Sequence, residues 1–308
     1  MKKYLLALAA LSLSASVAFA QGTDALGFTQ INHNPVTSAF AGAGSAYNGT
    51  AAWSAFSNAS ILPFYEGTMD MAAGLQLWAP GTSKSTNIGI GTAVKLTRRI
   101  AFSVGYTLNN GESYDLLDYN GQVSGKFSPK DHVIALGAGF GLGESFGVGV
   151  NLRYAMQKLS AEDSFGGVSG DVFVAYQFNP DFRVTAGVST LGTAITANNR
   201  KKFSQPANAK LAVDWGTRFA EVHSLHLMAD GEYYFSGNFG AAAGLQYSWN
   251  EMVFVRAGYR FASEYCVIPS HLALGIGAKF FGVHVDVSYL TASKALGNTL
   301  NIGLGYSF

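Results

Sequence analysis

The chain has 308 residues, a net charge of +1 and 13% charged residues, about half the charged fraction of an ordinary soluble domain. Positive and negative charges nearly balance, and no basic patch carries interleaved aromatic residues. We therefore expect no nucleic-acid partner. A single cysteine, Cys266, excludes an internal disulfide framework. The mean hydropathy is +0.17, yet no stretch after the first twenty residues has the roughly 18 consecutive apolar residues of a spanning helix. The composition therefore favours a transmembrane β-barrel.

Residues 1–20 have the pattern of a secretory signal peptide. Two lysines precede a short apolar run, and the tripeptide AFA at residues 18–20 matches a cleavage site. A transmembrane anchor is the alternative, but the apolar run is too short and ends in small residues. We therefore expect a signal peptide that is cleaved before Gln21 during export.

Residues 21–64 do not alternate and are rich in small residues. A flexible leader is one interpretation, but the segment also contains Phe40, Tyr47, Trp53, Phe56 and Leu62. Large apolar side chains are rare in disordered tails. We therefore expect this segment to fold into the lumen of the barrel as a plug.

Residues 65–308 consist mostly of segments in which apolar residues occupy every second position, which is the period of a β-strand. About fourteen such segments have the length of a tilted membrane strand. They are 67–78, 87–97, 100–109, 131–142, 146–157, 168–178, 182–191, 207–217, 224–235, 238–249, 252–261, 271–280, 282–290 and 299–308. An even number of antiparallel strands fits a closed up-and-down barrel.

The two phases of these segments differ in charge. One phase is apolar and uncharged throughout, whereas the other carries nearly all the charge of the strands, including Lys210, Glu232, Arg260 and Lys279. Because a Lys or Arg facing lipid at mid-bilayer costs about 2–4 kcal/mol, we expect the first phase to face lipid and the second the lumen. The mixed lumen charges are expected to pair across strands rather than form a selective ion pore. A soluble β-sandwich is the alternative, but its strands are shorter.

The connections alternate between short turns, such as residues 143–145 and 250–251, and longer loops, such as residues 110–130 and 192–206. Outer-membrane barrels have short periplasmic turns and long external loops. The chain ends at Phe308 on the periplasmic side in this arrangement. Tyr306 and Phe308 also resemble the C-terminal signal that the barrel-assembly machinery recognises in bacterial outer-membrane proteins.

Eight strands already fill their own interior with side chains, so about fourteen leave room for water, a ligand or a plug. A small-residue element and a second short motif precede the first strand, and the residues of this plug motif are Asn34, Pro35, Gly42, Gly44, Asn58, Ala59 and Leu62. They resemble the signature of the FadL-like superfamily, a small-residue element followed by an Asn-Pro-Ala-x-Leu element before the first strand. Ala59 replaces the proline of the second element. The resemblance implies a fourteen-strand barrel with an N-terminal luminal plug and the outer membrane as its location.

Within that superfamily, the size and the signal junction look most like the PorV/PorQ family of Bacteroidetes-type bacteria. This resemblance implies a non-enzymatic barrel that binds cargo or partner proteins in type IX secretion or surface attachment. The candidate partner-binding residues lie in the two long loops and are Tyr114, Leu116, Leu117, Tyr119, Arg200, Lys201 and Lys202.

A FadL-like uptake channel for hydrophobic small molecules is the alternative function, with lateral release of the ligand through a gap in the wall. Its candidate lining residues are Phe40, Trp53, Phe56, Phe173 and Phe254. A general porin is the third hypothesis.

No catalytic or metal-binding pattern is evident, and we expect no cofactor. His284 and Ser288 share a strand face but are four residues apart, too far for a nucleophile and its base to meet. The histidines are scattered, without metal-ligand spacing. The glycine-rich run at residues 137–143 lies within an alternating strand, where its glycines are expected to relieve crowding on the lumen side.

Overall fold

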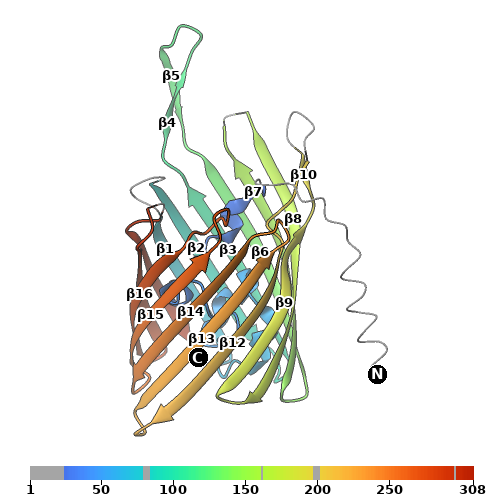
Figure 1. Cartoon of the computed structure of the whole chain (residues 1–308), viewed down its shortest axis with the longest axis vertical. Coiled ribbons are helices and arrows are strands. Elements are labelled where there is room, and N and C mark those ends of the chain that lie inside the picture. Colours follow the sequence, from blue (N-terminus) through green and yellow to red (C-terminus); the bar gives the residue numbers. More distant parts are fainter. Residues whose placement is uncertain (1–23, 79–83, 161, 197–201, 295) are drawn as a thin grey trace, which may run out of the picture.

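The computed structural model describes residues 24–78, 84–160, 162–196, 202–294 and 296–308. Its main feature is a closed barrel of antiparallel strands (Figure 1). The fourteen wall strands are β1 (Met69–Trp78), β2 (Ser85–Lys95), β3 (Ile100–Asn110), β6 (Lys130–Leu142), β7 (Phe146–Lys158), β8 (Ser164–Asn179), β9 (Phe182–Gly192), β12 (Asn208–Phe219), β13 (His223–Tyr234), β14 (Phe239–Trp249), β15 (Val253–Ala262), β16 (His271–Phe280), β17 (Val283–Thr291) and β18 (Thr299–Ser307). The predicted number of strands is confirmed, and the predicted signal peptide lies outside the described residues.

Each wall strand pairs with its neighbour in the chain, and β1 pairs with β18 to close the cylinder. The seam runs from Asp70 opposite Ser307 to Leu77 opposite Leu300. At one end of the barrel the strands are joined by short turns. At the other end, the loop end, the chain forms two further hairpins, β4 (Tyr114–Leu117) with β5 (Val123–Phe127) and β10 (Ile195–Thr196) with β11 (Lys202–Phe203).

The outer face of the barrel is apolar, as the alternation predicts. Side chains of the apolar phase, such as Leu136 and Val255, are about half exposed, whereas the charged phase points inward. Among the described wall strands, the charged residues on the outward phase are Lys130 and Lys158, which face each other at the loop-end rim. The membrane-facing band therefore carries no charge between its two rims.

Residues 24–64 lie inside the barrel, and we call them the plug (Figure 1, blue). The plug contains η1 (Gly27–Gln30), α2 (Pro35–Ala39), η2 (Ala51–Phe56) and η3 (Ala59–Phe64). It starts at the loop end, where the Ala25 N–H donates to the Ser204 carbonyl (2.8 Å). It leads into β1 at the short-turn end. None of the helices in the described part of the chain is long and apolar enough to cross a membrane.

The motif residues shape the plug locally. Asn34 caps α2 by accepting a hydrogen bond from the Val36 N–H, and Pro35 occupies the first helical position, where a missing N–H costs nothing. Asn58 caps η3 in the same way by accepting from the Ser60 N–H (2.9 Å). Gly44 adopts a left-handed φ of 113°, which other residues reach only with strain.

Glycines on the lumen phase let the plug approach the wall backbone. Gly244 and Gly258 face each other on β14 and β15, and Phe40 fits against both of them. Gly139, in the glycine-rich run, lies against the carbonyl oxygen of Ala59. A side chain at any of these positions would collide with the plug, so these glycines form its socket.

Candidate functional site

Wall side chains hold the plug by hydrogen bonds to its backbone. The Asp230 carboxylate accepts from the N–H groups of Gly44 (2.9 Å) and Ser45 (3.1 Å). Asp70 accepts from the N–H of Ala52 (2.8 Å). Because these groups are buried, each bond satisfies a polar atom that water does not reach. The plug is therefore fixed to the wall on opposite sides of the lumen.

The buried lumen charges pair with one another, as expected from their mixed signs. The pairs are Arg153 with Asp171, Arg183 with Asp214, Lys210 and Arg260 with Glu232, and Arg256 with Asp286. Other cations of the lumen phase lie outside this buried set: Lys279 and Arg218 are exposed near the short-turn end, where Arg218 pairs with Glu251. Most of the charge inside the barrel is thus part of its structure.

A cavity of about 150 Å³ lies between the plug and the wall. Its apolar lining includes Phe28, Trp53 and Phe56 from the plug and Trp78 from β1. Its charged lining includes Lys210 of β12, Glu232 of β13 and Arg260 of β15. The cavity is therefore apolar in one part and charged in another.

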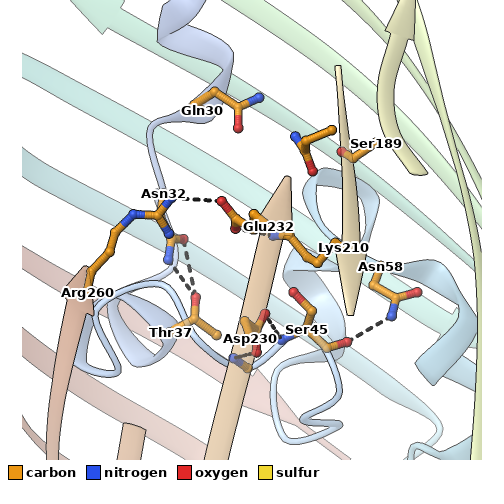
Figure 2. A network of polar contacts seen from close by, with 12 residues as sticks. Gln30, Asn32, Thr37, Ser45, Asn58, Ser189, Lys210, Asp230, Glu232 and Arg260 are labelled. Carbon is orange, nitrogen blue, oxygen red and sulfur yellow. Dashed lines mark hydrogen bonds and ion pairs between the residues drawn. The ribbon is translucent and has the colours of Figure 1, made fainter. Parts of the chain in front are cut away.

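The charged part of the cavity is centred on Glu232. One carboxylate oxygen accepts from the Lys210 ammonium (2.7 Å), and the other accepts from Arg260 (2.7 Å) and the Tyr234 hydroxyl (2.9 Å). Figure 2 shows Glu232 between Arg260 and Lys210. The hydroxyl of Tyr234 also lies 3.5 Å from the Gln30 side chain, which joins this cluster to the plug. Two cations thus share a single carboxylate.

The histidine of the plug is also buried. His33 contacts the Asn109 side chain through Nε2 (2.7 Å) and the Ile31 carbonyl through Nδ1 (3.0 Å). Burial away from water lowers the pKa of His33, although these two contacts oppose the shift. The ring is therefore neutral at pH 7.

A second hollow of about 650 Å³, which we call the side groove, lies where β9 separates from β12. Their pairing ends at Ser189 opposite Asn208, whereas β9 continues beside β8 to Gly192. A bulge marks this point: Asp171 faces two residues of β9, and Thr190 there has a φ of 58°. The Thr190 N–H donates to Asp171 (2.7 Å), which stabilises the bulge.

The side groove reaches both faces of the wall. Leu152, Val168 and Leu191 line it from the lipid side. Asp24 lines it from the plug, and Gln205 bridges it by donating to the carbonyls of Val168 and Thr193 (both 3.0 Å). The groove therefore leads from the first residues of the plug to the lipid-facing surface.

The structure brings only two of the five predicted lining residues to the cavity, Trp53 and Phe56. Phe40 is fully buried in the socket, and Phe173 packs over Gly187. Phe254 lies under the guanidinium of Arg256, 5.0 Å from ring centre to carbon. These three side chains therefore do not line this cavity, because the alternation of a strand indicates which residues face the lumen but not what fills the space beside them.

The predicted loop residues are at the loop end. Tyr114, Leu117 and Tyr119 are exposed on the β4–β5 hairpin, whereas Leu116 is half-buried. Lys202 is exposed in β11, and the adjacent positions 200 and 201 lie outside the described residues.

The aromatic rings that end the chain are on the outer face. Tyr306 and Phe308 are exposed, with their centroids 5.5 Å apart. This position fits recognition from the membrane side, which stays a prediction.

The described residues contain no group of three or more His, Cys, Asp or Glu side chains that could hold a metal ion. His284 lies between the carboxylates of Asp286 (3.0 Å) and Asp70 (3.8 Å). Ser288 accepts a hydrogen bond from Asn301 (3.0 Å). His284 therefore belongs to the ion-pair network of the wall, and Ser288 links β17 to β18 by a hydrogen bond.

No family model matches the sequence, and no curated protein matches it either. Several solved structures share the fold. The toluene transporter TbuX of Ralstonia pickettii has 13% identity and a TM-score of 0.61 over 89% of this chain and 97% of its own. The monoaromatic hydrocarbon channel CymD has 14% identity and a TM-score of 0.63 over 90% and 98%. The toluene transporter TodX of Pseudomonas putida has 13% identity and a TM-score of 0.57 over 86% and 96%.

At such identities the likeness establishes the fold. A closed barrel of fourteen strands, an uncharged outer band and a plug that precedes β1 agree with it. The chain therefore has the fold of these barrels, a closed cylinder of fourteen antiparallel strands preceded by an N-terminal segment, which agrees with the fold that the sequence resemblance implied.

Proposed function

We propose that this barrel is a channel for small hydrophobic molecules of about one aromatic ring. The observation that carries the proposal is the partly apolar cavity of about 150 Å³ inside the lumen. An engineered apolar protein cavity of about this volume binds benzene. The structural neighbours TbuX, CymD and TodX, described as a toluene transporter, a monoaromatic hydrocarbon channel and a toluene transporter, support the same size of ligand.

The route that we propose runs from the loop end into the cavity and leaves through the side groove. Phe28 and Gln30 line the cavity, whereas Asp24, a few residues earlier, lines the side groove. The first turn of the plug thus separates the two spaces. Leu26 in this turn has a φ of 57°, an uncommon and strained conformation for leucine. A shift of this turn would join the cavity to the lipid-facing surface.

The test is an enlarged side chain in the cavity. Ile268 lines the cavity near the loop end, and Ile268→Trp narrows it. The matched control is Ile134→Trp, because Ile134 is exposed on the outer face. We expect toluene uptake into cells lacking the native gene to be restored by the wild type and the control but not by the cavity variant. Equal toluene entry with all three proteins and with the empty vector would reject the proposal.

A protein-binding role of PorV/PorQ type is the second candidate function. Its support is the β4–β5 hairpin, which projects far beyond the barrel (Figure 1). Its tip exposes Leu117 (64%), Val123 (60%) and Tyr119 (104%), and exposed apolar side chains of this kind mark interaction surfaces when they cluster. Secretion components or cargo proteins that co-purify with the wild type should be lost when residues 113–128 are replaced by a short Gly-Ser turn. Recovery of the same proteins with both forms would contradict this role.

A general porin needs an open lumen, whereas here the plug lies against glycines of several wall strands, including β1 and β18. Planar-bilayer conductance measures this difference directly, and we expect small, infrequent openings. A large steady conductance would support the porin hypothesis instead.

A further inference from the structure

The charged part of the cavity does not suit a plain hydrocarbon. Lys210, Glu232 and Arg260 all line it, and the side chain of Arg260 is almost completely buried. A hydrocarbon placed here would remove water from these groups without replacing its hydrogen bonds. Burial of a polar group without a partner is unfavourable, and burial of an unpaired charge is more so. The cavity therefore favours a ligand with a polar substituent.

The contacts of the cluster indicate which substituent fits. Lys210 and Arg260 share the Glu232 carboxylate, so two cations meet one anion in direct contact. The Asp230 carboxylate, whose two oxygens accept from the plug N–H groups, is a second anion near Lys210, so the preference for a ligand with acceptor oxygens rests on the free donors of the cluster. The second arginine of the cavity, Arg153, is already paired with Asp171.

The cluster also has unused hydrogen-bond donors. The Nε of Arg260 is buried and has no acceptor among the described residues. The Lys210 ammonium has three protons, and the contact with Glu232 uses one of them. These donors belong to side chains that line the same cavity as Trp53 and Phe56. A single-ring molecule with an anionic oxygen group matches both parts of the lining.

We propose that the cavity binds an aromatic carboxylate of one ring, with its carboxylate at Lys210 and Arg260 and its ring among the apolar side chains. This inference rests on the proposed channel function and names its substrate class. Charge-assisted hydrogen bonds to a carboxylate are about twice as strong as neutral ones. The cavity volume of about 150 Å³ fits an acid of one ring.

Discrimination follows from the same chemistry. A site built to pair with a polar group rejects an analogue that lacks it, since its own groups are then left unpaired. Benzoate and toluene are nearly the same size and differ in this one feature. We expect the wild type to bind benzoate at least tenfold more tightly than toluene.

The experiment is calorimetric titration of the full-length protein in detergent with benzoate and with toluene at pH 7. Lys210→Met keeps the stem and removes the charge, so benzoate affinity should fall about ten- to a hundredfold. Lys210→Arg should retain most of the affinity. The control is Lys279→Met, because Lys279 is an exposed cation of the lumen phase that does not line the cavity.

The outcomes separate the two proposals. The carboxylate inference is overturned if the wild type binds toluene more tightly than benzoate. It is also overturned if Lys210→Met binds benzoate with unchanged affinity. Neither result contradicts the channel function. If neither compound binds to the wild type and neither enters cells through it, the channel function itself fails. The comparison of ligands on the wild type needs no variant, so a folding defect in Lys210→Met does not affect it.

Discussion

The close contact between Phe40 of the plug and Gly244 of the wall allows a quantitative prediction. In Gly244→Ala the new Cβ atom would lie 2.6 Å from the Cβ of Phe40 and 3.2 Å from its Cα. Ordinary contact begins at 3.4 Å, so the plug would have to move by at least 0.8 Å there. Phe40 is fully buried and Gly258 borders it on the next strand, which leaves little space for this shift. Overpacking of this kind typically costs about 1–3 kcal/mol.

Hydrogen exchange of the plug amides measures this effect locally. A loss of 1–3 kcal/mol corresponds to roughly 5- to 150-fold faster exchange of residues 40–47, since about 1.4 kcal/mol is a factor of ten. The control is Gly231→Ala on β13, because Gly231 is on the outer face and its nearest neighbour is 4.0 Å away. Wild-type protection of residues 40–47 in Gly244→Ala would show that the plug is not held by close contact with the wall.

Four further outcomes follow from the contacts described above. Ile134→Arg should lower the free energy of unfolding in lipid by about 2–4 kcal/mol, measured by urea titration, whereas Ile134→Leu should not. Asp230→Ala leaves two plug N–H groups without an acceptor and should accelerate their exchange more than Asp230→Asn does. Because the folded state keeps His33 neutral while the unfolded chain takes up a proton below about pH 6.5, plug stability should fall as the pH drops below that value, and His33→Gln should remove this dependence. Deletion of Phe308 should reduce the amount of folded barrel in the outer membrane, measured by heat-modifiable mobility, and an undiminished amount would contradict its role in assembly.

The strands of the wall could be predicted from the sequence because each strand has one face toward lipid and one toward the lumen. This difference gives every strand the same two-residue period. In β15, for example, Val253, Val255 and Ala257 alternate with Phe254 and Arg256, and both faces are as predicted. The β4–β5 hairpin was missed. Its strands have four and five residues and a register shift, too short for alternation to stand out within a loop.

The site was less predictable than the wall. Sequence placed Lys210, Glu232 and Arg260 on the lumen phase but could not tell which cation meets which carboxylate, because this depends on register and on closure of the cylinder. A plug inside the lumen was expected from the aromatic content of the segment, but its contacts with individual wall strands were not. One signal was available: glycines on the lumen phase of neighbouring strands, such as Gly244 and Gly258, mark places where another backbone comes close.

The path of the plug constrains the order in which the molecule is built. Ala25 lies beside Ser204 at the loop end, whereas Met69 begins β1 at the opposite end, so the chain runs through the cylinder from end to end. A finished cylinder could receive this segment only by drawing the free N-terminus through its whole length, past the narrow contacts at the wall glycines. Wrapping the strands around the segment avoids that passage. We therefore expect the seam between β1 and β18 to close last, with residues 24–64 already enclosed.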